Sequence, residues 1–472
     1  MINRHKSACS AGCQAIVLAA CMMLSGCSGD RNAVLTPILE AEDEVYKFIP
    51  AGNGAGPMWC HGSTSIVRIG DKVFASGLET VPEWKPLNNC RWMLFERDKA
   101  GWKKLITDEK GRTREPGPMA AFHNGQFFLS ANPTLTSLSD YNGPSRPEMF
   151  LFDSKRDLSQ PEQISPVWAG TPSFTEHSYR SLAADGASGE LILFQNIDYT
   201  HAEWSFRDRN GKWPAQGKID WPWGADNEVP GPIRVCYPNV MMKDRAVYFC
   251  GVSDIIEPKK AWREYKRELT GNEWDYDFRR LFFTWSDDIA TGTFHQWIEI
   301  ASREATCGWI SPGDLWVTHD GAVHILWTER AIDERLREKF FPEAKQSHSI
   351  NYAIVRNGKV DVRRSIHTAE EGISNEIPGQ ARFHITPDSR LMIVYFVKGT
   401  NVAGQPVAEN RIVEMTPDGF PGKPVILPLK QPFSNFFMAT VRAGSQPSKI
   451  IDMFGTPDGV NNAMHYARVL LK

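Results

Sequence analysis

A hairpin that returns along the chain is the feature of the sequence that most limits its fold. Each copy is a pair of apolar segments joined by a short polar turn, and several turns carry the Asn-Gly or Asp-Gly pairs of tight hairpins. A third apolar segment follows most copies after a loop, and a fourth usually follows the third. The seven hairpins span residues 63–76, 119–131, 181–194, 236–251, 315–328, 381–396 and 437–454.

Four-stranded units that recur every roughly 55–75 residues are the signature of a β-propeller. The content of 16 Trp, 25 Phe, 37 Gly and 31 Pro agrees with a turn-rich β protein. We therefore predict an all-β fold, a seven-bladed β-propeller of four-stranded antiparallel blades, as a single domain over residues 51–472. Because the last unit is short, we expect the segment before the first hairpin to complete it. A pair of packed β domains is the alternative.

The N-terminus has the pattern of a targeting segment. A basic start precedes an apolar run, residues 15–24, that is too short to span a bilayer. The next residues, Leu24-Ser25-Gly26-Cys27, resemble the bacterial lipobox. This implies a lipoprotein signal peptide over residues 1–27, lipidation of Cys27 and a tether over residues 28–50; an ordinary signal peptide is the alternative. We expect a lipid-anchored protein of the cell envelope, on the periplasmic or cell-surface side, that meets the membrane through this anchor only.

Blade geometry predicts where binding residues lie. The start of the first strand, the end of the second and the loop between the second and third strands share one face of a propeller. Most of the longest loops fall there, among them residues 253–279 and 330–348, with a short helix expected over Ile332–Phe340. Such loops wall one mouth of the central channel. A formal net charge of -3 without a basic face argues against nucleic acid as a partner.

The stretch 175–196 brings the densest group of candidate residues to this mouth. It reads as a hairpin with its turn over 185–189, so polar residues before its first strand and after its second meet at one edge. Together with neighbouring blades it offers cations, phenols and imidazoles, which can hold an acidic sugar and move protons. The candidate substrate-binding residues are His61, Tyr179, Arg180, Asn196, Arg234, Trp309, Glu329, Arg382 and His384.

Two local features resemble BNR-repeat (sialidase-like) propellers. The run Trp285-Ser286-Asp287-Asp288, followed by Gly292-Thr293-Phe294, resembles a degenerate Asp box of that family. His177 and Tyr237-Pro238 open the inner strands of neighbouring blades, which is similar to the propeller polysaccharide lyases of the ulvan lyase type. The resemblance implies that His177 and Tyr237 carry the acid–base work of β-elimination on an acidic, uronate-containing polysaccharide.

The sequence departs from that lyase pattern at two places. Those families carry a second His where Asn196 stands, and an Arg where Gly251-Val252-Ser253 stands. The cation that holds the uronate carboxylate would then be Arg180, Arg234 or Arg382. Two other functions stay open. One is a sialidase-like glycoside hydrolase that combines such arginines with Tyr395 and with Glu329 or Glu79. The other is a propeller that binds a glycan or a protein without turnover.

Five cysteines follow Cys27 in a chain expected to reach an oxidising compartment. Cys236 and Cys250 flank one hairpin turn symmetrically, so a disulfide between them is the plain interpretation. The alternative is a zinc site in which Cys307 is the third ligand, beside Cys236 and Cys250. Cys60 and Cys90 bracket the inner pair of the first blade and form a second expected disulfide. The predicted reaction requires no cofactor, and the sequence leaves a structural zinc or calcium ion open.

Overall fold

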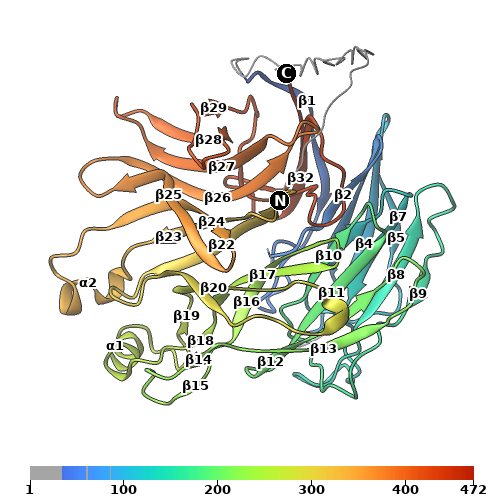
Figure 1. The fold of residues 1–472 in the computed structure, drawn as a ribbon, viewed down its shortest axis with the longest axis horizontal. Coiled ribbons are helices and arrows are strands. Elements are labelled where there is room, and N and C mark those ends of the chain that lie inside the picture. The colour runs from blue at the N-terminus through green and yellow to red at the C-terminus, as the bar shows by residue number, and fades with distance from the viewer. Residues whose placement is uncertain (1–34, 60–61, 85–86) are drawn as a thin grey trace, which may run out of the picture. The chain divides into compact units, whose positions relative to one another are not determined.

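The computed structural model describes residues 35–59, 62–84 and 87–472. Residues 36–472 form one compact unit, in which seven four-stranded antiparallel sheets stand around a common centre (Figure 1). The described ranges also contain two short two-stranded ribbons, two α-helices and one 3-10 helix. The predicted all-β class and the seven-bladed β-propeller are confirmed.

The first four blades follow one another along the chain. Blade 1 holds β2 (Ile66–Ile69), β3 (Lys72–Thr80), β4 (Cys90–Asp98) and β5 (Gly101–Thr107). Blade 2 holds β6 (Met119–Ala121), β7 (Gln126–Ala131), β8 (Glu148–Asp153) and β9 (Glu162–Ile164). Blade 3 holds β10 (Ser181–Asp185), β11 (Glu190–Ile197), β12 (His201–Arg207) and β13 (Ala215–Asp220). Blade 4 holds β16 (Val235–Lys243), β17 (Ala246–Ser253), β20 (Arg280–Ser286) and β21 (Ile298–Ser302).

The remaining three blades complete the ring. Blade 5 holds β22 (Trp309–Val317), β23 (Val323–Arg330), β24 (Ser347–Arg356) and β25 (Lys359–Glu370). Blade 6 holds β26 (Asn375–Ile385), β27 (Leu391–Thr400), β28 (Pro406–Met415) and β29 (Val425–Ile426). Blade 7 holds β30 (Phe433–Met438), β31 (Ile450–Pro457), β32 (Ala463–Leu471) and β1 (Pro37–Lys47). The ribbons pair β14 (Trp223–Gly224) with β15 (Gly231–Pro232), and β18 (Ile255–Ile256) with β19 (Tyr276–Asp277). The helices are α1 (Lys260–Thr270), η1 (Ile289–Thr291) and α2 (Glu334–Phe340).

Strand β1 closes the propeller as the outer strand of blade 7. It pairs antiparallel with β32, from Pro37 opposite Leu471 to Lys47 opposite Ala463. The expectation that the segment before the first hairpin completes the last unit is thus confirmed. The tether expected over residues 28–50 is corrected at residues 37–47, because this segment covers an otherwise open sheet edge. The expected signal peptide and Cys27 lie outside the described residues.

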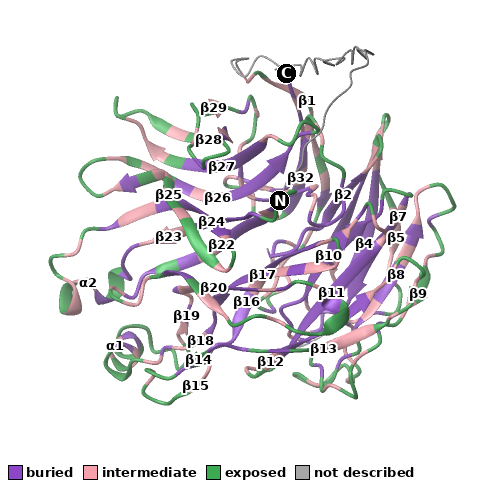
Figure 2. Cartoon of the chain, viewed as in Figure 1, coloured by how far each residue is buried: buried purple, intermediate pink, exposed green. Residues whose placement is uncertain are grey.

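Tight turns and buried inner strands explain why each unit forms a blade. In blade 3, Gly189 closes the turn at φ +72°, and its backbone N donates to Asp185 O at 3.0 Å. Apolar side chains then fill the space between adjacent blades, as where the Phe194 ring lies 5.2 Å from the Phe249 ring. Burying one such side chain contributes about 1.5–3 kcal/mol. Burial is greatest on the inner strands, while outer strands and loops are more exposed (Figure 2).

The Asp-box-like run of blade 4 spans the end of β20 and the turn that leads to β21. The Asp288 carboxylate accepts from Ala290 N at 2.9 Å and so caps helix η1. The Trp285 indole donates to Asp287 Oδ1 at 3.1 Å. The residues that carry the sialidase-like resemblance therefore stabilise a turn, as an Asp-capped bend does in general.

Both α-helices lie in long loops between the second and third strands, α1 in blade 4 and α2 in blade 5. The helix expected over Ile332–Phe340 is confirmed as α2, which Asp333 caps by accepting from Arg335 N at 3.1 Å. Helix α1 was not expected, although Trp262, Tyr265 and Leu269 recur at helical spacing in its sequence, so this helical signal was missed. Neither of these nor any other helix in the described ranges is long and apolar enough to cross a membrane.

The four cysteines whose placement is described, Cys90, Cys236, Cys250 and Cys307, are buried free thiols. The predicted Cys236–Cys250 disulfide is wrong. The turn pairs Lys243 with Ala246, and this register places Cys250 opposite Asn239, while Cys236 lies beyond a bulge and opposite Val252. The second expected disulfide is corrected as well, since Cys90 is free; its expected partner Cys60 lies outside the described residues.

Candidate functional site

The mouth of the channel at blade 3 holds His177 against a buried carboxylate. Glu115 is 1% exposed, and its Oε1 lies 3.2 Å from His177 Nδ1. The same carboxylate accepts from the backbone N of Ser178 at 2.7 Å and from its hydroxyl at 3.0 Å. These contacts hold the Glu115 carboxylate beside the imidazole, while the His177 side chain stays 34% exposed. A histidine that lies beside a carboxylate and is still accessible can exchange a proton with a ligand.

An aromatic cluster joins His177 to Tyr237 of the neighbouring blade. The Trp59 ring lies 5.0 Å from the His177 ring and 5.9 Å from the Tyr237 ring. Tyr179 also contacts both rings, at 5.6 Å and 5.0 Å. Phe278 extends the cluster beyond Tyr237, at 6.1 Å. The structure thus brings the two residues predicted to transfer protons into one cluster, which we call the mouth cluster: Trp59, His177, Tyr179, Tyr237 and Phe278.

Tyr237 stands on an irregular backbone. It lies in the bulge between Cys236 and Asn239, at φ +48°. A left-handed conformation of a non-glycine residue costs on the order of 1–3 kcal/mol and persists where the surroundings impose it. Bulges of this kind re-aim a side chain relative to a regular strand. The local backbone therefore sets the direction of the Tyr237 phenol.

A buried ion pair, Arg234 with Asp254, contacts the Tyr179 ring of the mouth cluster. Arg234 Nη2 lies 2.6 Å from Asp254 Oδ2, and the guanidinium lies over the rings of Tyr199 at 3.8 Å and Tyr179 at 5.1 Å. Burial raises the pKa of Asp254 in spite of the Arg234 charge. Burial is also the main reason why the pKa of Tyr179 lies well above its ordinary value. A phenol that resists ionisation is a poor nucleophile, so Tyr179 is placed to shape the site.

Arg180 and Asn196 belong to the support of the mouth, and their predicted role in substrate binding is corrected. Arg180 is buried, and its guanidinium donates to the main-chain oxygens of Ser130 at 3.1 Å and Pro116 at 2.9 Å. The amide oxygen of Asn196 accepts from Tyr179 N. Both side chains satisfy buried main-chain groups next to the strand ends, where such groups would otherwise be unpaired.

Arg382 and His384 lie inside the propeller, away from the mouth, which corrects a second pair of predictions. Strand β26 begins at Asn375, so these residues stand near its far end. Arg382 donates to Gly313 O, and His384 Nε2 lies 2.7 Å from Ser448 O. Burial lowers the pKa of Arg382 to about 10 and that of His384 to about 4. These groups satisfy main-chain carbonyls in the interior.

Trp309 and Glu329 stand at the mouth side of blade 5, where the sequence predicted them. Trp309 begins β22, is 40% exposed and lies 4.5 Å from Phe278, so it continues the mouth cluster outward. Glu329 accepts from Arg303 and from the Trp327 indole, the latter at 3.2 Å. Of the two, Trp309 offers the larger surface for a ligand. The predicted site residue His61 lies outside the described residues.

The cysteine set predicted for zinc does not come together. The Cys307 thiol lies 3.5 Å from Glu257 Oε2 and 3.5 Å from Arg279 Nη1. Burial raises the pKa of Cys307 to about 12, whereas zinc binds the thiolate. Cys236 and Cys250 lie in the apolar core. Over the described ranges, no group of three His, Cys, Asp or Glu side chains is placed to hold a metal ion.

Sequence reasoning missed Glu115, Trp59 and Phe278. Glu115 stands shortly before β6, at a position that blade geometry assigns to the mouth, so the rule used for the other blades could have found it. Trp59 and Phe278 lie in irregular loops outside any hairpin pattern. No local signal marks them, because their role depends on which loops meet across the channel.

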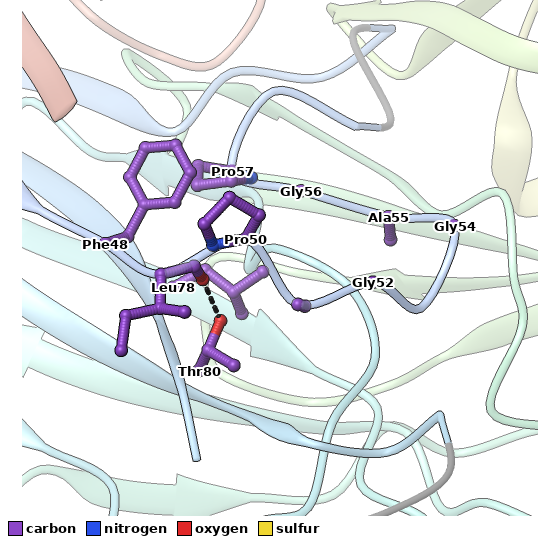
Figure 3. Close-up of a pocket in the computed structure, with 11 residues that line it drawn as sticks. Phe48, Pro50, Gly52, Gly54, Ala55, Gly56, Pro57, Leu78 and Thr80 are labelled. Atoms are coloured by element: carbon purple, nitrogen blue, oxygen red, sulfur yellow. Dashed lines mark hydrogen bonds between the residues drawn. The ribbon is translucent and has the colours of Figure 1, made fainter. Parts of the chain in front are cut away.

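A small cavity lies beside blade 1, and Figure 3 shows residues that line it, none of which belongs to the mouth cluster. Its volume is about 160 Å³, and its walls come from the segment 48–57 with Leu78 and Thr80. The Thr80 hydroxyl donates to Ile49 O across it. Its lining contains no titratable side chain, so it offers no group for proton transfer.

No family model and no curated protein matches the sequence. Among solved structures, the chain is similar to a protein of unknown function from Dyadobacter fermentans, at 10% identity and a TM-score of 0.40 over 75% of this chain and 94% of that one. It is similar to the α-L-arabinofuranosidase of Fusarium graminearum in complex with arabinobiose, at 9% identity, a TM-score of 0.39 and coverages of 75% and 91%. It is also similar to the sialidase of Trypanosoma rangeli, at 10% identity and a TM-score of 0.38 over 81% of this chain and 60% of that one. Similarity of this size carries no argument about the reaction of this chain.

Proposed function

We propose that this protein is a carbohydrate-active propeller that binds an acidic glycan at the channel mouth and cleaves it by β-elimination. One observation carries the proposal: His177 and Tyr237, from neighbouring blades, contact the same Trp59 ring. A partly exposed imidazole and a phenol that contact the same indole ring are a pair that we assign to remove and deliver protons on one sugar.

The chemistry assigns a role to each member of the pair. His177 takes the proton from C5 of a uronate, the C4–O4 bond breaks, and a C4=C5 double bond forms. The Tyr237 hydroxyl gives its proton to the departing O4, and solvent water then carries the proton from the His177 imidazolium to the Tyr237 phenolate, so both side chains return to their starting state. Glu115 stabilises the imidazolium that results, because its carboxylate lies 3.2 Å from His177 Nδ1. Atoms and charge then balance without a cofactor.

Arg234 is the nominated arginine that contacts the mouth cluster, but it is 5% exposed and paired with Asp254 at 2.6 Å, so we assign its charge to act on the uronate carboxylate from behind the Tyr179 ring and without direct contact. Of the three arginines that the sequence nominated, Arg180 and Arg382 donate to main-chain carbonyls in the interior. Arg234 lies over the Tyr179 ring, which itself belongs to the mouth cluster. A cation near the carboxylate lowers the pKa of the C5 proton.

Hydrolysis by two carboxylic groups has less support at this mouth. That reaction needs a pair of Asp or Glu side chains flanking the scissile bond, and the sialidase type, which uses a Tyr instead, would need Tyr395, which is fully buried on β27. The carboxylates of Glu115, Asp254 and Glu329 are each at most 10% exposed and lie against His177, Arg234 and Arg303, respectively. They are therefore occupied as partners of other side chains.

The proposal is tested with a panel of uronate-containing polymers and purified protein. We expect a rise in ultraviolet absorbance from the new double bond, and its loss in His177→Ala. Binding without any new chain ends would leave a glycan-binding propeller, and new chain ends without absorbance would indicate hydrolysis; either result overturns the lyase proposal.

A further inference from the structure

The channel beneath the mouth cluster is occupied by a loop from blade 7. Residues 439–449 connect β30 to β31 and reach the inner strands of blades 2 and 3. Ala121 N donates to Ala443 O at 2.8 Å, and Ala184 N donates to Arg442 O at 3.0 Å. A Cβ on Gly444 would lie 1.8 Å from Ala121 O, so this approach requires glycine. The loop is thereby fixed to strands of other blades.

Arg442 extends from this loop and is 2% exposed. Its Nε donates to Asp314 Oδ1 at 2.6 Å, and its Nη1 donates to Gly62 O at 2.6 Å. The other oxygen of Asp314 accepts from Phe383 N at 3.0 Å. The Arg442 guanidinium is therefore fixed by Asp314 of blade 5, which is itself bonded to blade 6, and it donates to the carbonyl of Gly62.

Gly62 lies directly against the bulge that carries Tyr237. A Cβ at Gly62 would lie 2.4 Å from Tyr237 O and 2.4 Å from Pro238 O. No side chain fits this gap without moving one of the two segments. Tyr237 has the left-handed φ of +48° at this contact, a conformation that its surroundings must impose.

We propose that Arg442 and Gly62 are positioning residues for Tyr237. Arg442 fixes Gly62, and Gly62 holds the bulge in the conformation that directs the phenol to the mouth. The expected loss of kcat in variants of these residues rests on the proposed function, whereas the expected change in the conformation of Tyr237 does not. Misplacing a reacting group by 1 Å lowers the rate by about 100-fold.

The test compares Gly62→Ala and Arg442→Met with Arg68→Met. Arg68 is a matched control, because it is also a buried arginine paired with an aspartate, Asp452, at 2.5 Å. In crystal structures of the first two variants we expect Tyr237 to leave its left-handed φ or its ring to leave contact with Trp59. Tyr237 unchanged in both variants would overturn the proposal, whatever the activity of the protein.

Kinetics supply the second readout. We expect kcat on a uronate polymer to fall about 100-fold in Gly62→Ala and Arg442→Met, with Kd for an oligosaccharide within about twofold. Arg68→Met should keep kcat within about twofold, and Arg442→Lys should recover part of the loss. Equal kcat in Arg442→Met and Arg68→Met would overturn the inference.

If Arg442→Met does not fold, Gly62→Ala decides, because it leaves the Arg442–Asp314 pair in place. If the wild-type protein shows no turnover, the proposed function is wrong, but the positioning of Tyr237 is still tested by its conformation in the crystal structures of the variants.

Discussion

The Nδ1 atom of His177 lies 3.2 Å from Oε1 of Glu115, although the two residues are far apart in sequence. The segment before blade 2 supplies the carboxylate and the segment before blade 3 supplies the imidazole. A ring of blades makes this contact, because it places the approaches to successive inner strands side by side at one mouth. His177 thereby lies beside the Glu115 carboxylate and between the rings of Trp59 and Tyr179, which are 5.0 Å and 5.6 Å away.

Replacing Glu115 tests whether orientation of His177 matters. We expect Glu115→Gln to lower kcat at least about 10-fold, because the amide no longer stabilises an imidazolium. Glu176→Gln is the control: Glu176 is as buried but accepts from Gly143 N at 3.0 Å. Turnover of the two variants is compared on the same polymer. Indistinguishable kcat values would contradict the role of Glu115.

Replacing Tyr237 tests the proton donor. Tyr237→Phe keeps the ring in the mouth cluster and removes the hydroxyl, so kcat should fall about 10²–10⁴-fold while Kd for an oligosaccharide changes little. Tyr248→Phe removes a hydroxyl from β17 of the same blade and should leave kcat unchanged. Steady-state kinetics and calorimetry measure both. A Tyr237→Phe variant with normal kcat would remove the phenol from the mechanism.

Trp309 tests the binding surface. Trp309→Ala should weaken glycan binding by about 5–10-fold, near 1 kcal/mol, because an exposed aromatic face next to Phe278 is lost. Trp223→Ala is the comparison, since Trp223 is also exposed but lies in the β14–β15 ribbon. Calorimetric titration with one oligosaccharide ranks the variants. An unchanged Kd for Trp309→Ala would place the glycan elsewhere.

The stability of the fold should depend on pH through His384. Burial lowers the pKa of His384 from 6.5 to about 4, so the unfolded chain binds more protons than the folded one between these values. The stabilising contribution is complete above pH 6.5 and is lost as pH falls through 4, with an upper limit of about 3 kcal/mol.

Urea unfolding at pH 7 and pH 4 measures this contribution. The wild type should lose up to about 3 kcal/mol more than His384→Gln, which keeps a donor for Ser448 O. His319→Gln, at an exposed turn, should follow the wild type. If wild type and His384→Gln lose the same free energy of unfolding, His384 is not the group that titrates.

Local sequence patterns predicted the blades well, because each hairpin is specified by its own turn and its own apolar segments. The turn at Gly189 and the helix near Asp333 are examples. The short last unit predicted that an N-terminal segment closes blade 7, but it did not predict the bounds of strand β1. Apolar and polar residues alternate only weakly over residues 37–47, and this segment is buried by its pairing with β32.

Side-chain direction was harder to predict than strand position. Arg180 and Arg382 carry the right chemistry for a sugar carboxylate, but each turns to main-chain carbonyls of another blade. Cys236 and Cys250 flank one turn, but the pairing of Lys243 with Ala246 sets a register in which Cys250 faces Asn239 and Cys236 faces Val252. These outcomes depend on contacts between blades, which a single stretch of sequence does not contain.

Simultaneous measurement of double bonds and new chain ends on a uronate polymer tests the central claim most directly. We expect ultraviolet absorbance and chain ends to rise together with wild-type protein, to stop in His177→Ala and to fall steeply in Tyr237→Phe. Chain ends that appear without absorbance, or absorbance that persists in His177→Ala, would contradict that claim.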